Sequence, residues 1–156
     1  MLLLSIVLFT AAADPAPRFQ SPHGISLVVP EGFAEATAAQ NEGMPHVWAK
    51  AVKDGSLVVS VQRMPGGANG KCPSELELKK LKLPPDTTVE AIPLDWQGAA
   101  VCAMLTTTTQ NGAAFVDYMV DLPVPKGAAL HVGGPKSAER LVLSTLTKLL
   151  KTVRPG

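Results

Sequence analysis

Three consecutive runs rich in β-forming residues, at 89–96, 99–110 and 113–122, constrain the fold of this chain more than any other feature. The pairs that join them are Gln97-Gly98 and Asn111-Gly112. Asn-Gly is the strongest short-range signal for a two-residue hairpin turn, because both residues accept positive φ angles. The sequence therefore predicts an antiparallel meander in which each run pairs with the next.

The rest of the chain predicts a further hairpin and two separate strands. Runs at 46–52 and 57–63 flank an Asp-Gly pair, which also favours a tight turn. In the second run, Leu57, Val59 and Val61 share one face, and Ser60 and Gln62 lie on the other. Short apolar runs at 25–29 and 128–132 predict two more strands.

Two helices are expected. Ser74 and Glu77 form a capping-box pattern at the start of a short helix, which Pro84-Pro85 would end. The clearest element is a closing helix over 138–153, for which Ser137 is the expected N-cap. Its apolar residues fall on one face at 100° per residue: Val142, Leu143, Leu146, Leu149, Leu150 and Val153.

The middle run of the meander is apolar on both faces between Ala100 and Leu105. A strand of this kind is expected to be covered on both sides. We therefore expect an α+β fold, with an antiparallel sheet and helices packed on both of its faces.

The combination of two local patterns resembles a known superfamily. One is an early strand that runs into Pro30-Glu31-Gly32-Phe33, and the other is a late strand followed by Gly134-Pro135 and the closing helix. This order resembles the PsbP-like superfamily, including its small exported bacterial members of unknown role. The resemblance implies the same sheet covered by helices on both faces. It implies no catalytic residue, because that superfamily carries no universal catalytic set.

The N-terminus has the pattern of a secretory leader. The apolar run 2–9 precedes Ala11-Ala12-Ala13, an A-x-A cleavage site, although no Lys or Arg precedes the run. The alternative is a buried N-terminal strand or helix. The apolar stretch at 2–13 is 12 residues long, which is too short for a membrane span of about 20. We expect a signal peptide at 1–13, a Pro-rich tether at 14–22 and a single domain at 23–156, in a secreted or periplasmic protein.

Cys72 and Cys102 are the only cysteines. In an exported chain an even pair favours a disulfide, and we predict this bond. The alternative is a reactive or metal-binding pair of thiols. The spacing fits no C-x-x-C redox or zinc pattern, so no metal or cofactor is expected from these residues.

The charge pattern argues against nucleic acid as a partner. Fourteen basic and 13 acidic residues give a formal net charge of +1, with no basic stripe. The glycine-rich segment 66–72 lies between a predicted strand and a predicted helix, but it is one residue short of a P-loop. Cys72 also stands where a P-loop has Ser or Thr. We interpret the segment as a loop and expect no bound cofactor.

The candidate chemical residues are few. A metal site could combine the three histidines, His23, His46 and His131, with Asp54 or Asp117, but their spacing favours isolated surface histidines. Asp117 and Asp121 lie on one strand face, which indicates a solvent-facing side more than an acid/base pair. The other unusual residues are interpreted as structural: Thr106–Thr109 as a strand end, and Trp48 and Trp96 as core anchors.

These features favour an exported, non-catalytic accessory or binding domain, whose partner is a protein or a small ligand. The alternative is a small exported enzyme with a histidine-centred site assembled from distant residues. Two histidines and a carboxylate in one pocket would favour the enzyme. A broad apolar or aromatic patch on a sheet edge or face would favour the binding domain.

Overall fold

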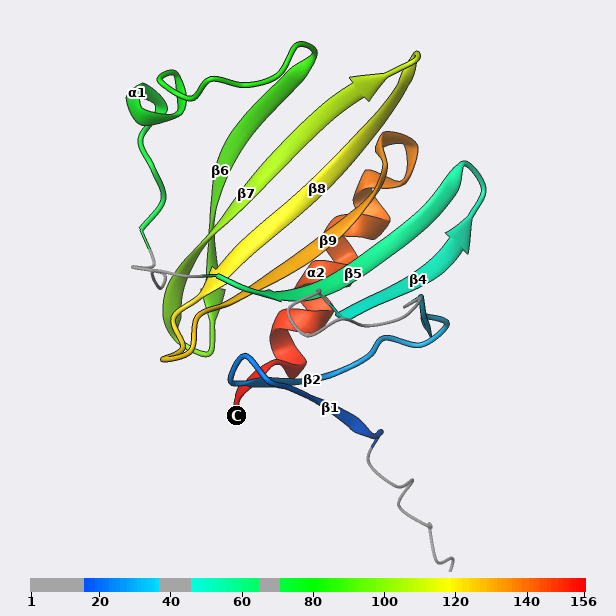
Figure 1. Cartoon of the computed structure of the whole chain (residues 1–156), viewed down its shortest axis with the longest axis vertical. Coiled ribbons are helices and arrows are strands. Elements are labelled where there is room, and N and C mark those ends of the chain that lie inside the picture. The colour runs from blue at the N-terminus through cyan, green and yellow to red at the C-terminus, as the bar shows by residue number, and fades with distance from the viewer. Residues whose placement is uncertain (1–15, 37–45, 65–70) are drawn as a thin grey trace, which may run out of the picture.

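The computed structural model describes residues 16–36, 46–64 and 71–156. These residues form a seven-stranded antiparallel sheet and a smaller three-stranded sheet (Figure 1). The larger sheet has the strand order β3-β4-β5-β9-β8-β7-β6. Its strands are β3 (Ala34–Glu35), β4 (His46–Val52), β5 (Gly55–Arg63), β6 (Thr87–Trp96), β7 (Ala99–Gln110), β8 (Ala113–Leu122) and β9 (Ala128–Pro135).

The smaller sheet closes one end of the molecule. It consists of β1 (Arg18–Ser21), β2 (Ile25–Val28) and β10 (Arg154–Pro155), with β2 in the middle. The described helices are the single-turn α1 (Glu75–Leu78), a 3-10 turn (Lys136–Ala138) and α2 (Glu139–Thr152). Figure 1 shows α2 running behind β9 and β5, while α1 lies beside β6, an edge strand of the larger sheet.

The predicted meander is confirmed. Strands β6, β7 and β8 pair in sequence, with Trp96 opposite Ala99 and Gln110 opposite Ala113. The two turns have the positive φ angles that such connections require: Gln97 55°, Gly98 82°, Asn111 50° and Gly112 78°. The two turns therefore specify the register of three of the seven strands.

The core lies between α2 and the sheet face that α2 covers, here called the inner face. Alternate residues of each central strand point inward, such as Val101, Ala103 and Leu105 on β7. The helix contributes Val142, Leu146, Leu149 and Leu150. Trp48 and Trp96 also belong to this core, as predicted.

The predicted helix stripe is wrong at one position. Leu143 is 39% exposed, whereas Thr145 is buried. The helix therefore rests on the sheet along a line shifted by part of a turn from the apolar stripe. Burial of Thr145 is tolerated because its hydroxyl donates a hydrogen bond to the Leu141 carbonyl at 2.8 Å.

The expectation of an α+β fold with helices packed on both faces is wrong. The described residues are mostly antiparallel strands, and α2 is the one long helix among them. The opposite sheet face, here called the outer face, carries no helix in the described part of the chain. On β7 the residues of this face, Cys102 and Met104, are half-buried. The disulfide brings Cys72 over this strand, so a tethered segment covers part of an apolar face for which a helix was expected.

Local signals at the helix starts had different outcomes. The capping box is present, because the Ser74 hydroxyl accepts from the Glu77 amide and Glu77 accepts from the Ser74 amide. Ser137 is not the N-cap of the closing helix. It lies in the 3-10 turn, and its hydroxyl donates to Asp54 on the β4–β5 turn at 2.7 Å. Ser137 therefore hydrogen-bonds to a residue distant in sequence and not to a backbone amide of α2.

The N-terminal strand lies within the segment interpreted from sequence as a tether. Arg18–Ser21 pair with β2, and the Arg18 guanidinium donates to the carbonyl of Thr152 at the end of α2. A cation at this end of a helix satisfies a carbonyl that has no helical partner. In the described residues, no helix has the length and apolar character that crossing a bilayer requires.

Candidate functional site

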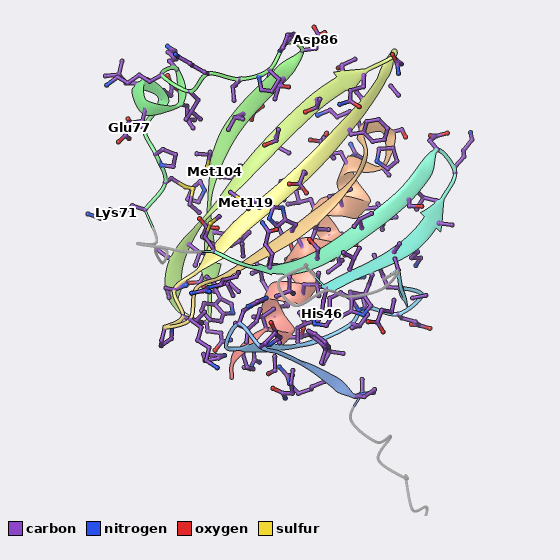
Figure 2. The ribbon with its side chains drawn as sticks, in the orientation of Figure 1. His46, Lys71, Glu77, Asp86, Met104 and Met119 are labelled. Carbon is purple, nitrogen blue, oxygen red and sulfur yellow. A yellow bond between two sulfur atoms is a disulfide. The ribbon has the colours of Figure 1, made fainter. Side chains whose placement is uncertain are left out.

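The outer face of the larger sheet carries the polar side chains most suited to a functional role. One cross-strand row runs from Ser60 on β5 through His131, Met119 and Met104 to Ala91 on β6. Figure 2 shows the two methionines side by side near the middle of this face. Because side chains alternate along a strand, the register of five strands assembles this row from residues far apart in sequence.

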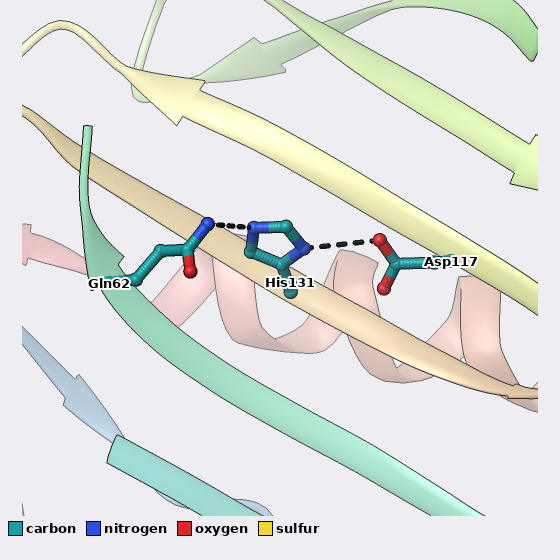
Figure 3. Close-up of polar contacts among 3 residues, drawn as sticks. All are labelled: Gln62, Asp117 and His131. Carbon is teal, nitrogen blue, oxygen red and sulfur yellow. Dashed lines mark hydrogen bonds and ion pairs between the residues drawn. The ribbon is translucent and has the colours of Figure 1, made fainter. Parts of the chain in front are cut away.

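His131 is held between two polar partners. Its Nδ1 lies 3.1 Å from a carboxylate oxygen of Asp117, and its Nε2 lies 2.7 Å from the amide nitrogen of Gln62 (Figure 3). The side chain of His131 is 20% exposed and that of Asp117 is 46% exposed. For His131, the expectation of an isolated surface histidine is therefore wrong.

This arrangement limits the chemistry available to the imidazole. A general base or a metal ligand needs a ring nitrogen with a free lone pair. In this structure Asp117 engages one nitrogen and Gln62 engages the other. The three side chains instead form a hydrogen-bonded bridge across β5, β9 and β8, which fixes the position of the ring on the outer face.

Asp121 is the unusual carboxylate of this face. It lies two residues beyond Met119 on β8, and its Oδ1 atom is buried with no hydrogen-bond partner among the described residues. Burial raises the pKa of the Asp121 carboxyl above its ordinary value, and nearby His131 opposes this shift. The strand pattern predicted a shared solvent-facing side for Asp117 and Asp121, but the two carboxylates differ in environment.

Replacement of Asp121 by Asn is expected to stabilise the protein at neutral pH. A carboxyl with a raised pKa in the folded state binds protons more tightly there than in the unfolded state, so its ionisation opposes folding. The penalty is complete above the folded-state pKa and absent below the ordinary value of 3.8. Denaturant unfolding should therefore show Asp121→Asn more stable than the wild type at pH 7, with the difference lost near pH 3.

The exposed turn residue Asp86 provides a matched control. Asp86→Asn should change the free energy of unfolding by less than about 0.5 kcal/mol at either pH. An Asp121→Asn variant that is less stable than the wild type at pH 7 would contradict a desolvated carboxylate at this position.

The other two predicted histidines lie near each other and away from His131. His46 is at the start of β4, beside the smaller sheet (Figure 2), and its ring lies 4.6 Å from the ring of Phe19. Burial lowers the pKa of His23, and the charges of His46, Arg63 and Lys126 lower it further. The cationic neighbours of His23 disfavour a cation site at that residue.

The structure does not assemble the metal site that the sequence analysis considered. Asp54 accepts from Ser137, whereas Asp117 contacts His131 alone among the histidines. Residues 16–36, 46–64 and 71–156 contain no group of three His, Cys, Asp or Glu side chains placed to hold a metal ion. Most of the P-loop-like segment, at 65–70, lies outside the described residues. The threonine run becomes more exposed from Thr106 to Thr109, as a strand end does.

A second candidate site lies on the other side of the molecule. A groove of about 750 Å³ runs between α2, the β2–β3 connection and β4. Its walls are largely apolar, and Val28, Phe33, Leu57, Leu141 and Leu149 are among the residues that line them. Lys50 on β4 and Lys148 on α2 also line the groove, together with the carboxylate of Glu31.

No sequence pattern predicted this groove. Lys50 and Lys148 are almost 100 residues apart and have no motif in common. The one local signal was Pro30-Glu31-Gly32-Phe33, which carried a superfamily resemblance but indicated no ligand site. Gly32 has a φ angle of +82°, and the Lys50 ammonium lies 3.0 Å from the position of a Cβ at Gly32. The turn therefore gives the lysine room to cross one wall of the groove.

Comparison with known proteins supports the fold and no more. No family model and no curated protein matches this chain. A crystal structure from Bacteroides thetaiotaomicron VPI-5482 superposes with a TM-score of 0.54 and 16% identity, over 90% of this chain and 48% of that one. This chain thus spans about half the length of that protein.

A second bacterial protein of similar fold is LpqN of Mycobacterium tuberculosis, whose crystal structure is described as that of a protein involved in cell envelope biogenesis. It aligns with a TM-score of 0.52 and 12% identity, over 90% of this chain and 85% of LpqN. Identities this low establish a shared architecture, and the function of this chain has to be argued from its own residues.

Proposed function

We propose that this chain is an exported, non-catalytic accessory domain of the bacterial cell envelope, which acts by binding a ligand or partner. The observation that carries the proposal is the environment of His131. The alternative function, a histidine-centred enzyme, needs a ring nitrogen that can take up and release a proton. His131 has Asp117 as a carboxylate partner, and Gln62 occupies the nitrogen on the other side of its ring.

Three further features support export and an envelope role. The A-x-A pattern at Ala11 to Ala13 suits a cleaved leader, with a mature chain that begins at Asp14. The Cys72–Cys102 bond suits an oxidising compartment. The fold resembles that of LpqN, and the element order resembles the small exported members of the PsbP-like superfamily, to which we assign this domain as part of the proposal. The leader would occupy 1–13, with a short tether before the domain.

The proposal is tested by restoring the wild-type chain and His131→Asn to a deletion strain of the native host. Asn can still hydrogen-bond to Asp117, but it does not titrate and cannot act as a general acid or base. Both proteins should be recovered from the exported fraction with Asp14 at the N-terminus. Both should restore resistance to envelope-damaging detergent to the same degree.

The enzyme hypothesis predicts a different result. Loss of general acid–base catalysis costs roughly 100-fold to 10,000-fold in rate, so His131→Asn would fail to restore resistance at wild-type protein levels. A chain that begins at residue 14 provides the control for export, because it should stay in the cytosol and fail. Recovery of uncleaved wild-type protein from the cytosol would also contradict the proposal.

A further inference from the structure

We propose that the groove between α2 and the β2–β3 connection binds a single-chain anionic amphiphile, with its acyl chain along the apolar walls and its anionic head between Lys50 and Lys148. The inference rests on the proposed function, since it names the ligand of a binding domain. It depends on three properties of the groove: its size, the partners of its polar wall groups, and the unbalanced charge of its lysines.

The size suits a small molecule. A groove of about 750 Å³ lies within the range of roughly 300–1,000 Å³ that is usual for ligand sites. It is long because it follows α2 from Leu141 to Thr152, a stretch of three helical turns. An extended chain fits this shape better than a compact ring does.

The hydroxyl groups in the walls are already engaged within the protein. Thr145 donates to the Leu141 carbonyl at 2.8 Å, and Thr152 donates to the Leu149 carbonyl at 3.0 Å. The Thr152 hydroxyl also accepts from the Val28 amide at 3.2 Å, which ties β2 to the helix. These walls therefore present mainly carbon to a ligand, and a sugar or nucleoside would find few partners there.

The lysines provide the charge selectivity. In residues 16–36, 46–64 and 71–156, neither the Lys50 nor the Lys148 ammonium has a carboxylate within 4.0 Å. Lys50 is half-buried, and Glu31 is the only acidic residue among the described residues that line the groove. Two cations and one anion leave a net positive charge beside an apolar wall. A carboxylate or phosphate head would gain charge-assisted hydrogen bonds there.

A fatty acid and an alkyl phosphate both combine an apolar chain with an anionic head, and the ligands used in the experiment distinguish the two. The exported protein, purified from its host and delipidated on a hydrophobic resin, is titrated by calorimetry with laurate and with dodecyl phosphate. Dodecanol provides the chain without the charge, and inorganic phosphate provides the charge without the chain. We expect saturable binding of laurate or dodecyl phosphate at least about tenfold tighter than of dodecanol, and no binding of phosphate alone. The tighter of the two anionic ligands identifies the head group.

The lysines are tested on the same protein with Lys148→Gln, Lys50→Gln and the control Lys151→Gln. Lys151 is on the same helix but does not line the groove. Each groove variant should weaken binding of the anionic ligand about tenfold and leave dodecanol binding unchanged, whereas Lys151→Gln should change neither. Lys148 is exposed, so its variant should fold even if substitution of Lys50 disturbs β4.

Several results would overturn the inference. One is equal binding of laurate and dodecanol, which would remove the role of charge, and another is an equal effect of Lys151→Gln. An amidated peptide of residues 2–13, which has no acidic group, provides the test for an occupant from this chain. The inference fails if that peptide binds as tightly as laurate. Absence of amphiphile binding together with normal export and normal activity of His131→Asn would refute this ligand and leave the proposed function standing.

Discussion

Replacement of Leu146 by Ala is expected to cost about 2–5 kcal/mol in the free energy of unfolding, the range observed when large buried side chains are truncated and leave a cavity. Leu146 is fully buried, with 0% of its surface exposed, near the middle of the face that α2 presents to the sheet. The surrounding strands are paired on both sides and cannot move in to fill the space. Urea unfolding monitored by circular dichroism gives the measurement.

The adjacent residue provides the control. Thr147 is exposed, and its hydroxyl donates to the Leu143 carbonyl at 2.9 Å within the helix. Thr147→Ala should therefore change stability by less than about 0.5 kcal/mol. Equal and small effects of the two substitutions would show that α2 does not dock on the inner face as the structure describes.

Removal of the disulfide with the double substitution Cys72→Ser and Cys102→Ser is expected to cost about 3–4 kcal/mol. The two cysteines are 30 residues apart in sequence and their Cα atoms are 5.0 Å apart. In the chain-entropy model, a loop of this length restricts the unfolded state by that amount. Guanidinium unfolding of the variant and the wild type under oxidising conditions gives the difference.

The disulfide should also have a local effect near α1. No residue of α1 is buried, and Leu76 within this helix is 67% exposed. Without the bond, little apolar burial holds this segment against β7. Limited proteolysis should therefore cleave the double variant between residues 71 and 86, while the wild type is cleaved there more slowly. Reduction of the wild-type protein should reproduce both effects, and a stability loss below about 1 kcal/mol would contradict the role given to the bond.

The sequence alone specified those parts of the structure that depend on neighbouring residues. Asn111-Gly112 and Gln97-Gly98 determined two turns, and with them the register of β6, β7 and β8. Helical periodicity located α2 to within one residue at each end and predicted the burial of Leu146. These features could be predicted because a turn or a helical face is determined by a few residues close together in the chain.

Where a tertiary contact competed with a local signal, the tertiary contact prevailed. Ser137 hydrogen-bonds to Asp54 and does not cap α2, and Leu143 is exposed while Thr145 is buried. The apolar middle of β7 predicted a second covering helix, but the structure places Cys72 of a disulfide-tethered segment over that strand. The apolar residues of a strand indicate that its face is shielded from solvent, but they do not specify which part of the chain packs on it.

Both candidate sites depend on tertiary structure alone. Gln62, Asp117 and His131 come together because β9 lies between β5 and β8, a strand order that no local pattern encodes. Lys50 and Lys148 line the same groove because α2 crosses the sheet beside β4 and the β2–β3 connection. Spacing along the chain therefore could not reveal either site. Each forms only when strands and a helix far apart in sequence pack against one another, because side-chain chemistry depends on distances in space.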